Sequence, residues 1–256
     1  MERERVRAMQ ALAANDIVMA WEYGRDKHPV DRALLFLTLA YPEMSPDTLR
    51  SFTIGQRNTL LLDLRGKTLG TLAYCLVKCS QCETELEFAI DTTTLYDADK
   101  DAQSVEPLTS IYIIQEDTFQ VSFRLPTSFD LAAIVGYDDI ITTRQMLIER
   151  CIVQAEHDGQ TIQAADLPET VIASLVRAML EHDPQAEIEM TLSCSTCDYS
   201  WSTLFDIVSF FWTEIETHAK RLLRDVDVLA RAYGWREADI LALSEARRQF
   251  YLELVR

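Results

Sequence analysis

The chain has 256 residues, of which 48% are hydrophobic, a composition typical of a globular protein rather than a disordered one. Its formal net charge is −17, and all of this excess lies in residues 29–213, which hold 28 acidic and 11 basic side chains, so this part would repel a nucleic-acid backbone. Only seven glycines occur, with neither a G-x-G-x-x-G nor a G-x-x-x-x-G-K-[ST] run, which disfavours the common nucleotide-binding enzymes.

The first 70 residues are predicted to form an N-terminal helical segment. Ser45 followed by Pro46 predicts a helix start, because serine caps helices and proline fits their first position. Asn15 and Asp16 are a second candidate cap. The expected helices cover residues 6–13, 17–23, 30–41 and 55–64, with a further one beginning at Ser45.

Residues 71–127 change to a strand pattern. Residues 71–77 lead into the first Cys-x-x-Cys turn, and residues 83–90 leave it with alternating polar and apolar side chains, which is typical of a half-buried strand. The acidic stretch 91–107 is the best candidate for a loop or linker. A second hairpin is predicted from residues 111–114 and 118–124.

Residues 128–185 are predicted to be a helical insertion, and residues 186–206 a second hairpin around the other Cys-x-x-Cys turn. The insertion would hold helices over residues 129–135, 140–155 and 168–180, with a turn at 157–160.

Residues 207–256 are predicted to form one long helix, ended by Gly234, and two short closing helices over 237–243 and 244–255. The apolar residues of the long helix repeat at nearly heptad spacing. A core helix packed on the N-terminal helices is the favoured interpretation, and a coiled coil with a partner is the alternative. The seam consists of Val208, Phe211, Ile215, Ala219, Leu222, Val226, Leu229 and Tyr233.

The expected fold class is therefore α+β, mostly helical, with a small antiparallel zinc-ribbon-like β module built from two distant Cys-x-x-Cys hairpins. The five segments are expected to form one composite domain.

Two Cys-x-x-Cys turns, here called knuckles, carry the clearest chemical signal. The first is Cys79 to Cys82 and the second is Cys194 to Cys197. Four thiolates in two such pairs form the ligand set of a closed, structural Zn²⁺ site without an open position for a substrate. A redox Cys-x-x-Cys is the alternative, but such motifs begin helices, whereas these knuckles lie between strands.

The remaining candidate residues do not form a catalytic constellation. Cys75 is expected to pack inward from its strand, although it could compete as a ligand, and Cys151 reads as a small core side chain. His28, His157, His182 and His218 are scattered without ligand spacing. We therefore expect no catalytic residues and no enzymatic activity.

Cysteine usage and the apolar pattern also predict a location. The N-terminus opens with alternating Glu and Arg, and no apolar run approaches the roughly 18–20 residues that span a bilayer. Six cysteines, four of them in knuckles, indicate metal ligands in a reducing compartment rather than a disulfide framework. A cytoplasmic protein is expected.

Three stretches, together with the knuckles, resemble a known family. They are SFTIGQRN at 51–58, FRLPTS at 123–128, and a tail that runs from AYGW at 232–235 through ILALS at 240–244 to RR at 247–248 and YL at 251–252. This order resembles baseplate proteins of contractile phage tails and phage-tail-like extracellular injection systems, a family usually linked to the T4-type baseplate hub assembly chaperone.

The resemblance implies a non-enzymatic structural or assembly role, as a chaperone or adaptor near the hub and spike, within or acting on a phage-tail-like particle. The implied partners are baseplate hub and spike proteins. We expect no membrane and no small-molecule substrate, and the acidic charge disfavours a nucleic-acid partner. The tail from Trp235 to Tyr251 is a candidate interface, with a helical cap on the core as the alternative. A zinc-ribbon regulator or nucleic-acid-associated protein is the competing function, although Lys78 is nearly the only basic residue beside a knuckle.

Overall fold

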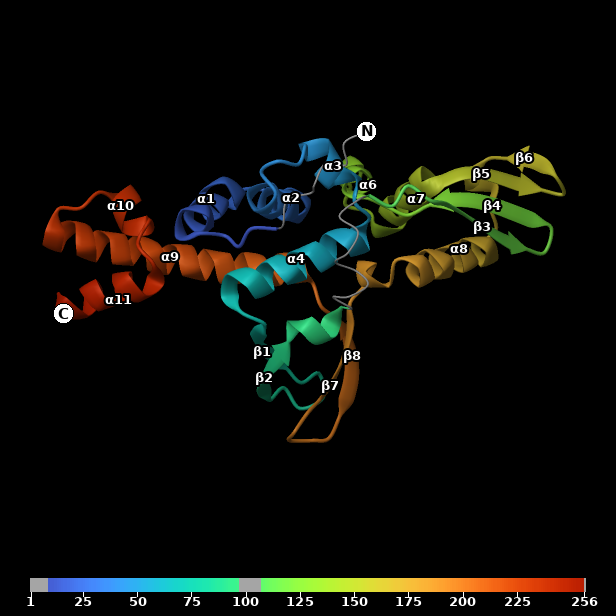
Figure 1. Cartoon of the computed structure of the whole chain (residues 1–256). Helices are drawn as coiled ribbons and strands as arrows, with labels where there is room; N and C mark the ends of the chain where they lie inside the picture. Colours follow the sequence, from blue (N-terminus) through green and yellow to red (C-terminus); the bar gives the residue numbers. More distant parts are fainter. Residues whose placement is uncertain (1–8, 97–106, 256) are drawn as a thin grey trace. The chain divides into compact units, whose positions relative to one another are not determined.

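The computed structural model describes residues 9–96 and 107–255, and these divide into two compact units (Figure 1). Unit 1 comprises Met1–Glu43, Leu61–Thr71 and Asp206–Arg256, and unit 2 comprises Met44–Leu60 and Leu72–Phe205. Both contain helices, and the strands belong to unit 2. The expected α+β class with small antiparallel sheets is confirmed.

Unit 1 is organised around the long helix α9 (Ile207–Tyr233), which packs against the other helices of this unit (Figure 1). These are α1 (Ala14–Gly24), α2 (Pro29–Ala40), α10 (Glu237–Leu241) and α11 (Glu245–Leu254), together with residues 61–69 of α4 (Ile54–Leu69). The seam predicted for α9 is buried except at Tyr233. Because the chain's own helices cover this seam, the core interpretation is confirmed over the coiled coil.

Close aromatic packing and a buried ion pair hold unit 1 together. The rings of Phe36 and Phe211 have centroids 4.7 Å apart. Arg65, whose side chain is 2% exposed, donates two hydrogen bonds to the Glu214 carboxylate, at 3.0 and 2.7 Å, and one to the Gly70 carbonyl at 2.7 Å. This bidentate geometry stabilises an otherwise costly buried guanidinium.

The start of unit 1 differs from the expected helices. Residues 9–13 are not helical, and residues 6–8 lie outside the described part. Helix α1 begins at Ala14, within the stretch read as a break, and the Asp16 carboxylate accepts the Ala13 backbone N–H at 2.9 Å. Asp16 therefore caps the helix from its third position rather than from outside it.

The end of unit 1 follows its predicted signals. Gly234 ends α9 in the left-handed conformation at φ +66°, which glycine adopts without a Cβ clash. The Ser244 hydroxyl accepts the Arg247 backbone N–H at 3.4 Å and caps α11.

Among its described residues, unit 2 contains three antiparallel sheets. Two are hairpins, one of β1 (Leu72–Lys78) with β2 (Glu85–Asp91) and one of β7 (Glu189–Ser193) with β8 (Ser200–Leu204). The third has four strands in the order β3 (Ile111–Glu116), β4 (Phe119–Arg124), β5 (Ile152–His157) and β6 (Gln160–Ile162). The helices of unit 2 are α3 (Pro46–Ser51), residues 54–60 of α4, α6 (Ser128–Ala133), α7 (Ile140–Cys151) and α8 (Glu169–His182), with short 3₁₀ turns at Thr92–Leu95, Ala164–Asp166 and Pro184–Ala186.

Helix α8 packs against β3 and β4, and a compact apolar core lies between helices and sheet (Figure 1). The core side chains are Val121, Phe123, Leu125, Ile148, Cys151, Ala155, Leu167, Val171, Leu175 and Met179.

The predicted helix over 140–155 is wrong in its last part. Helix α7 ends at Cys151, and the chain continues as β5, which pairs with β4 from Phe119↔His157 to Phe123↔Ile152. Asp158 and Gly159, at φ +51° and +76°, then form the two-residue turn into β6. Residues 128–185 therefore include two strands rather than helices alone, because pairing with a distant strand outweighs local helical periodicity.

The first stretch behind the family resemblance is held by residues far away in the sequence. Thr53 forms an isolated antiparallel bridge with Thr127, and the Gly55 backbone N–H donates to Asp183 Oδ2 at 2.9 Å. A Cβ at Gly55 would lie 2.0 Å from Asp183 Oδ1, so only glycine permits this approach. Asn58 Nδ2 donates to the Gln185 carbonyl at 2.9 Å.

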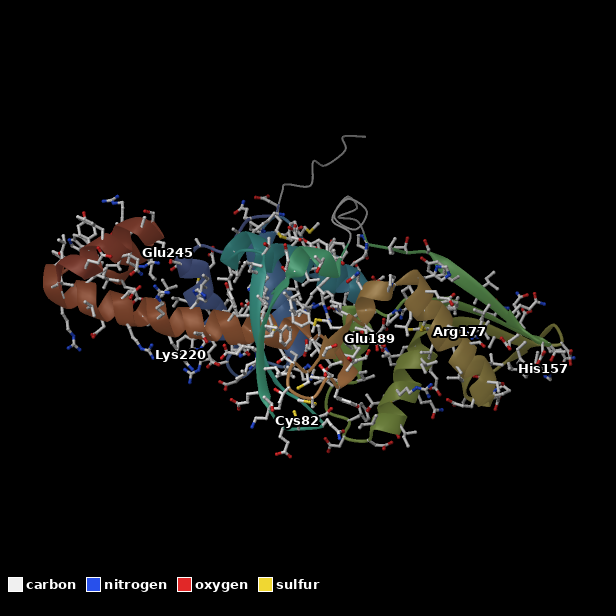
Figure 2. The ribbon with its side chains drawn as sticks, turned by 90° about the horizontal axis from the view of Figure 1, so that it is seen from below. Cys82, His157, Arg177, Glu189, Lys220 and Glu245 are labelled. Carbon is white, nitrogen blue, oxygen red and sulfur yellow. The ribbon has the colours of Figure 1, made fainter. Side chains whose placement is uncertain are left out.

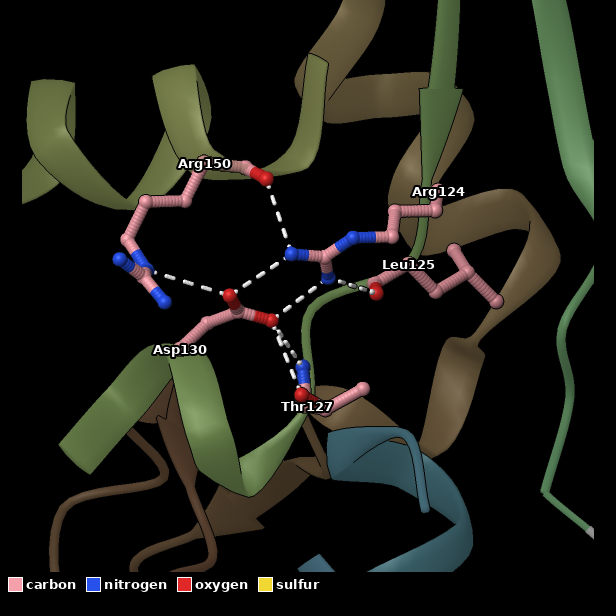
Figure 3. Close-up of polar contacts among 5 residues, drawn as sticks. All are labelled: Arg124, Leu125, Thr127, Asp130 and Arg150. Carbon is pink, nitrogen blue, oxygen red and sulfur yellow. Dashed lines mark hydrogen bonds and ion pairs between the residues drawn. The ribbon is translucent and has the colours of Figure 1, made fainter. Parts of the chain in front are cut away.

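A buried aspartate joins β4, α6 and α7 (Figure 3). The Asp130 side chain is 1% exposed and accepts hydrogen bonds from Arg124 at 2.6 and 2.8 Å, from Arg150 at 3.2 Å, and from the Thr127 backbone N–H and hydroxyl at 3.0 and 2.9 Å. Arg124 also donates to the carbonyls of Leu125 and Arg150. Burial alone would raise the pKa of Asp130, but the hydrogen bonds from Arg124 and Thr127 outweigh it and lower that pKa. We call this group the Asp130 clamp.

Two further expectations concern loops and membranes. The predicted loop at 91–107 begins with a 3₁₀ turn at Thr92–Leu95, and residues 97–106 lie outside the described part. Within residues 9–96 and 107–255, no helix has both the length and the hydropathy of a membrane span.

Candidate metal centre

The first knuckle is a tight turn between β1 and β2. The Cys79 backbone N–H donates to the Thr84 carbonyl at 3.0 Å, and the Glu83 N–H donates back to the Cys79 carbonyl at 2.9 Å. Glu83 adopts a left-handed conformation at φ +59°. Within the turn, the Gln81 N–H points at Cys79 Sγ, 3.4 Å away. This turn directs backbone donors toward a sulfur, which favours its thiolate.

The second knuckle, between β7 and β8, has the same hydrogen bonds at the same spacing. The Cys194 N–H donates to the Tyr199 carbonyl at 2.8 Å, and the Asp198 N–H donates to the Cys194 carbonyl at 2.9 Å. Asp198 is left-handed at φ +57°, and the Thr196 N–H lies 3.4 Å from Cys194 Sγ. The two turns are therefore the same local structure built twice.

The two knuckles lie against each other, and each sulfur of the first knuckle is close to a sulfur of the second. The Cys79 and Cys197 sulfurs are 3.7 Å apart, and the Cys82 and Cys194 sulfurs are 3.6 Å apart. All four sulfurs lie within 4.8 Å of one another. Figure 1 shows the two hairpins next to each other, and Figure 2 places Cys82 at the turn of the first. The predicted meeting of the two distant knuckles is thus present.

The geometry and the donors of this cluster fit a tetrahedral metal ion. Sulfurs about 2.3 Å from a central ion in a tetrahedron lie roughly 3.8 Å from one another, close to the two cross-knuckle distances of 3.7 and 3.6 Å. Cys79 and Cys194 are buried, whereas Cys82 and Cys197 are exposed. The cluster could therefore hold a metal ion.

The acidities of Cys82, Cys194 and Cys197 are shifted in different directions by their neighbours. Hydrogen bonds from the side chain and backbone of Thr84 lower the pKa of Cys82 to about 6. The Thr196 backbone N–H lowers the pKa of Cys194. The Tyr199 backbone favours the Cys197 thiolate, but desolvation and the neighbouring thiols together raise its pKa to about 12. Four adjacent thiolates repel one another, so a bound cation would stabilise the cluster by offsetting their negative charge.

The other candidate ligands lie elsewhere. Cys75 is half-buried on β1, opposite Phe88, and does not join the cluster. Cys151 is buried in the core, and burial raises the pKa of its thiol to about 12. Within the described ranges, no histidine belongs to a group of three or more close metal-binding side chains.

Two further features of this site carry no recognisable sequence signal. The first is Thr84, whose hydroxyl lies 3.3 Å from Cys82 Sγ. The second is the stacking of Tyr199 on Trp201 after the second knuckle, with centroids 6.0 Å apart. Their types are common in strands, so neither had a recognisable signal.

A comparison with protein families places most of the chain in a described family. A family model described as "T4 bacteriophage base plate protein" matches residues 39–212. No curated protein and no solved structure matches the chain. The matched range includes both knuckles and the stretches at 51–58 and 123–128, whereas the tail at 232–252 lies outside it. Because the match covers more than half of the residues, the chain belongs to the T4 bacteriophage base plate protein family.

Proposed function

We propose that this chain is a non-enzymatic structural or assembly protein of a contractile phage tail or phage-tail-like injection system. It acts near the baseplate hub and spike, in the manner of a hub assembly chaperone or adaptor. The observation that carries the proposal is the family match, since membership implies association with other baseplate proteins. A Cys₄ zinc site stabilises its fold.

Zinc is the proposed ion because of the donor set. Two pairs of cysteines in hairpin turns form a closed sulfur tetrahedron, which is typical of structural zinc and leaves no coordination position for a substrate. Such an ion would connect hairpins whose cysteines are 112 residues apart in sequence, from Cys82 to Cys194. The role of this ion is therefore to cross-link the two hairpins and stabilise the fold rather than to catalyse a reaction.

Charge supports a protein partner over a nucleic acid. Residues 29–213 hold 28 acidic and 11 basic side chains. Lys78, beside the first knuckle, already lies 3.5 Å from the Glu85 carboxylate. An acidic surface suits a basic patch on a hub or spike protein, and it weakens the competing proposal of a zinc-ribbon regulator.

The test combines metal analysis with binding. The chain, purified without chelator, is expected to hold one zinc per chain, and a Cys75→Ser control is expected to keep it. The same protein is titrated with the hub and spike proteins of its own particle at low salt and at about 1 M salt, where the Debye length is about 3 Å. Binding that weakens with salt supports the proposal.

Two results would contradict it. Absence of binding to both proteins at low salt removes the hub-proximal role. Salt-sensitive binding to duplex DNA or single-stranded RNA, in parallel titrations of the same sample, would favour the nucleic-acid alternative.

A further inference from the structure

A run of exposed apolar side chains connects α6 to α7. Their exposed fractions are 42% for Phe129, 42% for Val135, 55% for Tyr137, 82% for Ile140 and 77% for Ile141. Single exposed apolar residues are ordinary, but here five large ones lie within thirteen consecutive residues, and a concentration of exposed apolar side chains marks an interaction site. We call residues 129–141 the apolar ridge.

The apolar ridge is held in place at both ends. At its start, the Asp130 clamp fixes α6 to β4 and α7 (Figure 3). At its end, the Asp139 carboxylate accepts the Thr142 backbone N–H at 2.8 Å and caps α7. The Thr143 hydroxyl donates to the Asp139 carbonyl at 2.7 Å. A surface fixed in this way loses little conformational entropy when a partner binds.

The exposed charged side chains of the ridge itself are acidic. Asp138 and Asp139 are exposed near its end, and no lysine or arginine occurs from residue 125 to residue 143. The next basic residue, Arg144, lies 3.2 Å from the Glu169 carboxylate. Hydrogen bonds from Thr142 lower the pKa of Asp139, so this carboxylate stays ionised at neutral pH.

The charge pattern selects one kind of occupant. A second copy of this chain would place Asp138 and Asp139 against the same residues of its partner, within a chain of net charge −17. A surface with an apolar centre and lysine or arginine at its rim would instead bury the isoleucines and pair with both carboxylates.

We propose that the apolar ridge is the docking surface for another baseplate protein, which presents an apolar groove rimmed by basic side chains. This inference rests on the proposed function, because it takes the hub or spike protein as the partner. Ile140 and Ile141 fill the groove, Tyr137 closes its edge, and the two aspartates set the orientation and the salt dependence of binding.

The experiment compares two triple variants of the full chain. The test variant is Tyr137→Ser, Ile140→Ser and Ile141→Ser. The matched control is Tyr74→Ser, Leu76→Ser and Ile113→Ser, whose side chains are similarly exposed, at 76%, 64% and 63%. Zinc content and thermal melts establish that both fold. Each is titrated with purified hub protein and purified spike protein by isothermal calorimetry.

The expected result is a loss of affinity of about 100-fold or more for the test variant, because central apolar anchors carry most of the binding energy of an interface. The control should stay within about 3-fold of the wild type, as expected for residues outside the contact. Asp138→Asn should keep most of the affinity and reduce its dependence on salt.

The remaining outcomes separate the possible failures. If the wild type binds hub or spike and the test variant binds as tightly, the ridge proposal is overturned and the proposed function stands. Equal losses in test and control variants also overturn it. If the wild type binds neither protein, the proposed function fails and the ridge proposal with it. A wild-type dimer in sedimentation that the test variant abolishes would assign the ridge to self-association instead.

Discussion

Replacing Cys194 by serine should remove the metal and destabilise the fold by an amount set by chain topology. The sulfurs of Cys82 and Cys194 are 3.6 Å apart although the residues are 112 apart in sequence. A cross-link that closes a loop of this length removes chain entropy from the unfolded state worth about 5 kcal/mol at 25 °C, on the same scale as a disulfide. The variant should lose about this much stability.

The assay is thermal unfolding followed by circular dichroism, with and without a zinc chelator. For a chain of this size, about 5 kcal/mol corresponds to a fall of roughly 10–20 °C in Tm. The chelator should lower the Tm of the wild type to that of Cys194→Ser and leave the Tm of this variant unchanged, because chelator and mutation remove the same cross-link. Cys75→Ser, outside the cluster, is the control and should change Tm little.

Two results would refute the reasoning. One is a Cys194→Ser variant with the Tm of the wild type in the absence of chelator. The other is an additive effect of chelator and mutation, which would mean that the chelator acts elsewhere. An equal loss in Cys75→Ser would assign the effect to strand packing rather than to the metal.

Three further substitutions test the fold. Asp130→Asn should destabilise the protein by about 2–3 kcal/mol in urea unfolding, below the usual figure for a buried pair because both arginine partners are more than one-third exposed. The pKa of Asp130 is lowered in the folded state. The ionised carboxylate therefore stabilises the fold above its unfolded pKa of about 3.9, and this stabilisation is lost as pH falls through the folded pKa. The Asp130→Asn variant should accordingly lose stability less steeply in acid than the wild type. Gly24→Ala should cost about 1–3 kcal/mol, because a Cβ would lie 2.4 Å from the Trp212 ring, and unchanged stability would contradict that packing. Gly234→Ala should cost about 1–2 kcal/mol for a left-handed alanine, and the measurement is again the urea midpoint.

Features with a local cause were predictable from the sequence. Ser45 before Pro46 predicted the start of α3, and its hydroxyl accepts the Thr48 backbone N–H at 3.1 Å. Gly234 predicted the end of α9. The spacing within each knuckle predicted the two cysteine turns, because a Cys-x-x-Cys turn needs only its own few residues to place two sulfurs.

Features with a distant cause were not predictable in the same way. Residues 152–155 continue the helical spacing of α7, and only pairing with β4 makes them part of a strand. Asp158 and Gly159 were a usable hairpin signal, but they were read as a simple turn. The buried Asp130 has arginine partners six and twenty residues away in sequence, and no periodicity marks such a contact. Ile140 and Ile141 begin the helix as predicted, but their high exposure has no sequence signal.

The candidate metal centre is built from two knuckles that lie far apart in sequence, and this separation limits when the site can form during translation. The first knuckle emerges from the ribosome long before the second, so a metal ion held by Cys79 and Cys82 would lack its other two cysteine ligands while residues 83–193 are made. The four-stranded sheet and α8 lie wholly within that interval. A four-sulfur site can therefore form only after Cys197 has been synthesised. A chain with a closed site would be one in which the four-stranded sheet and α8 have already been made.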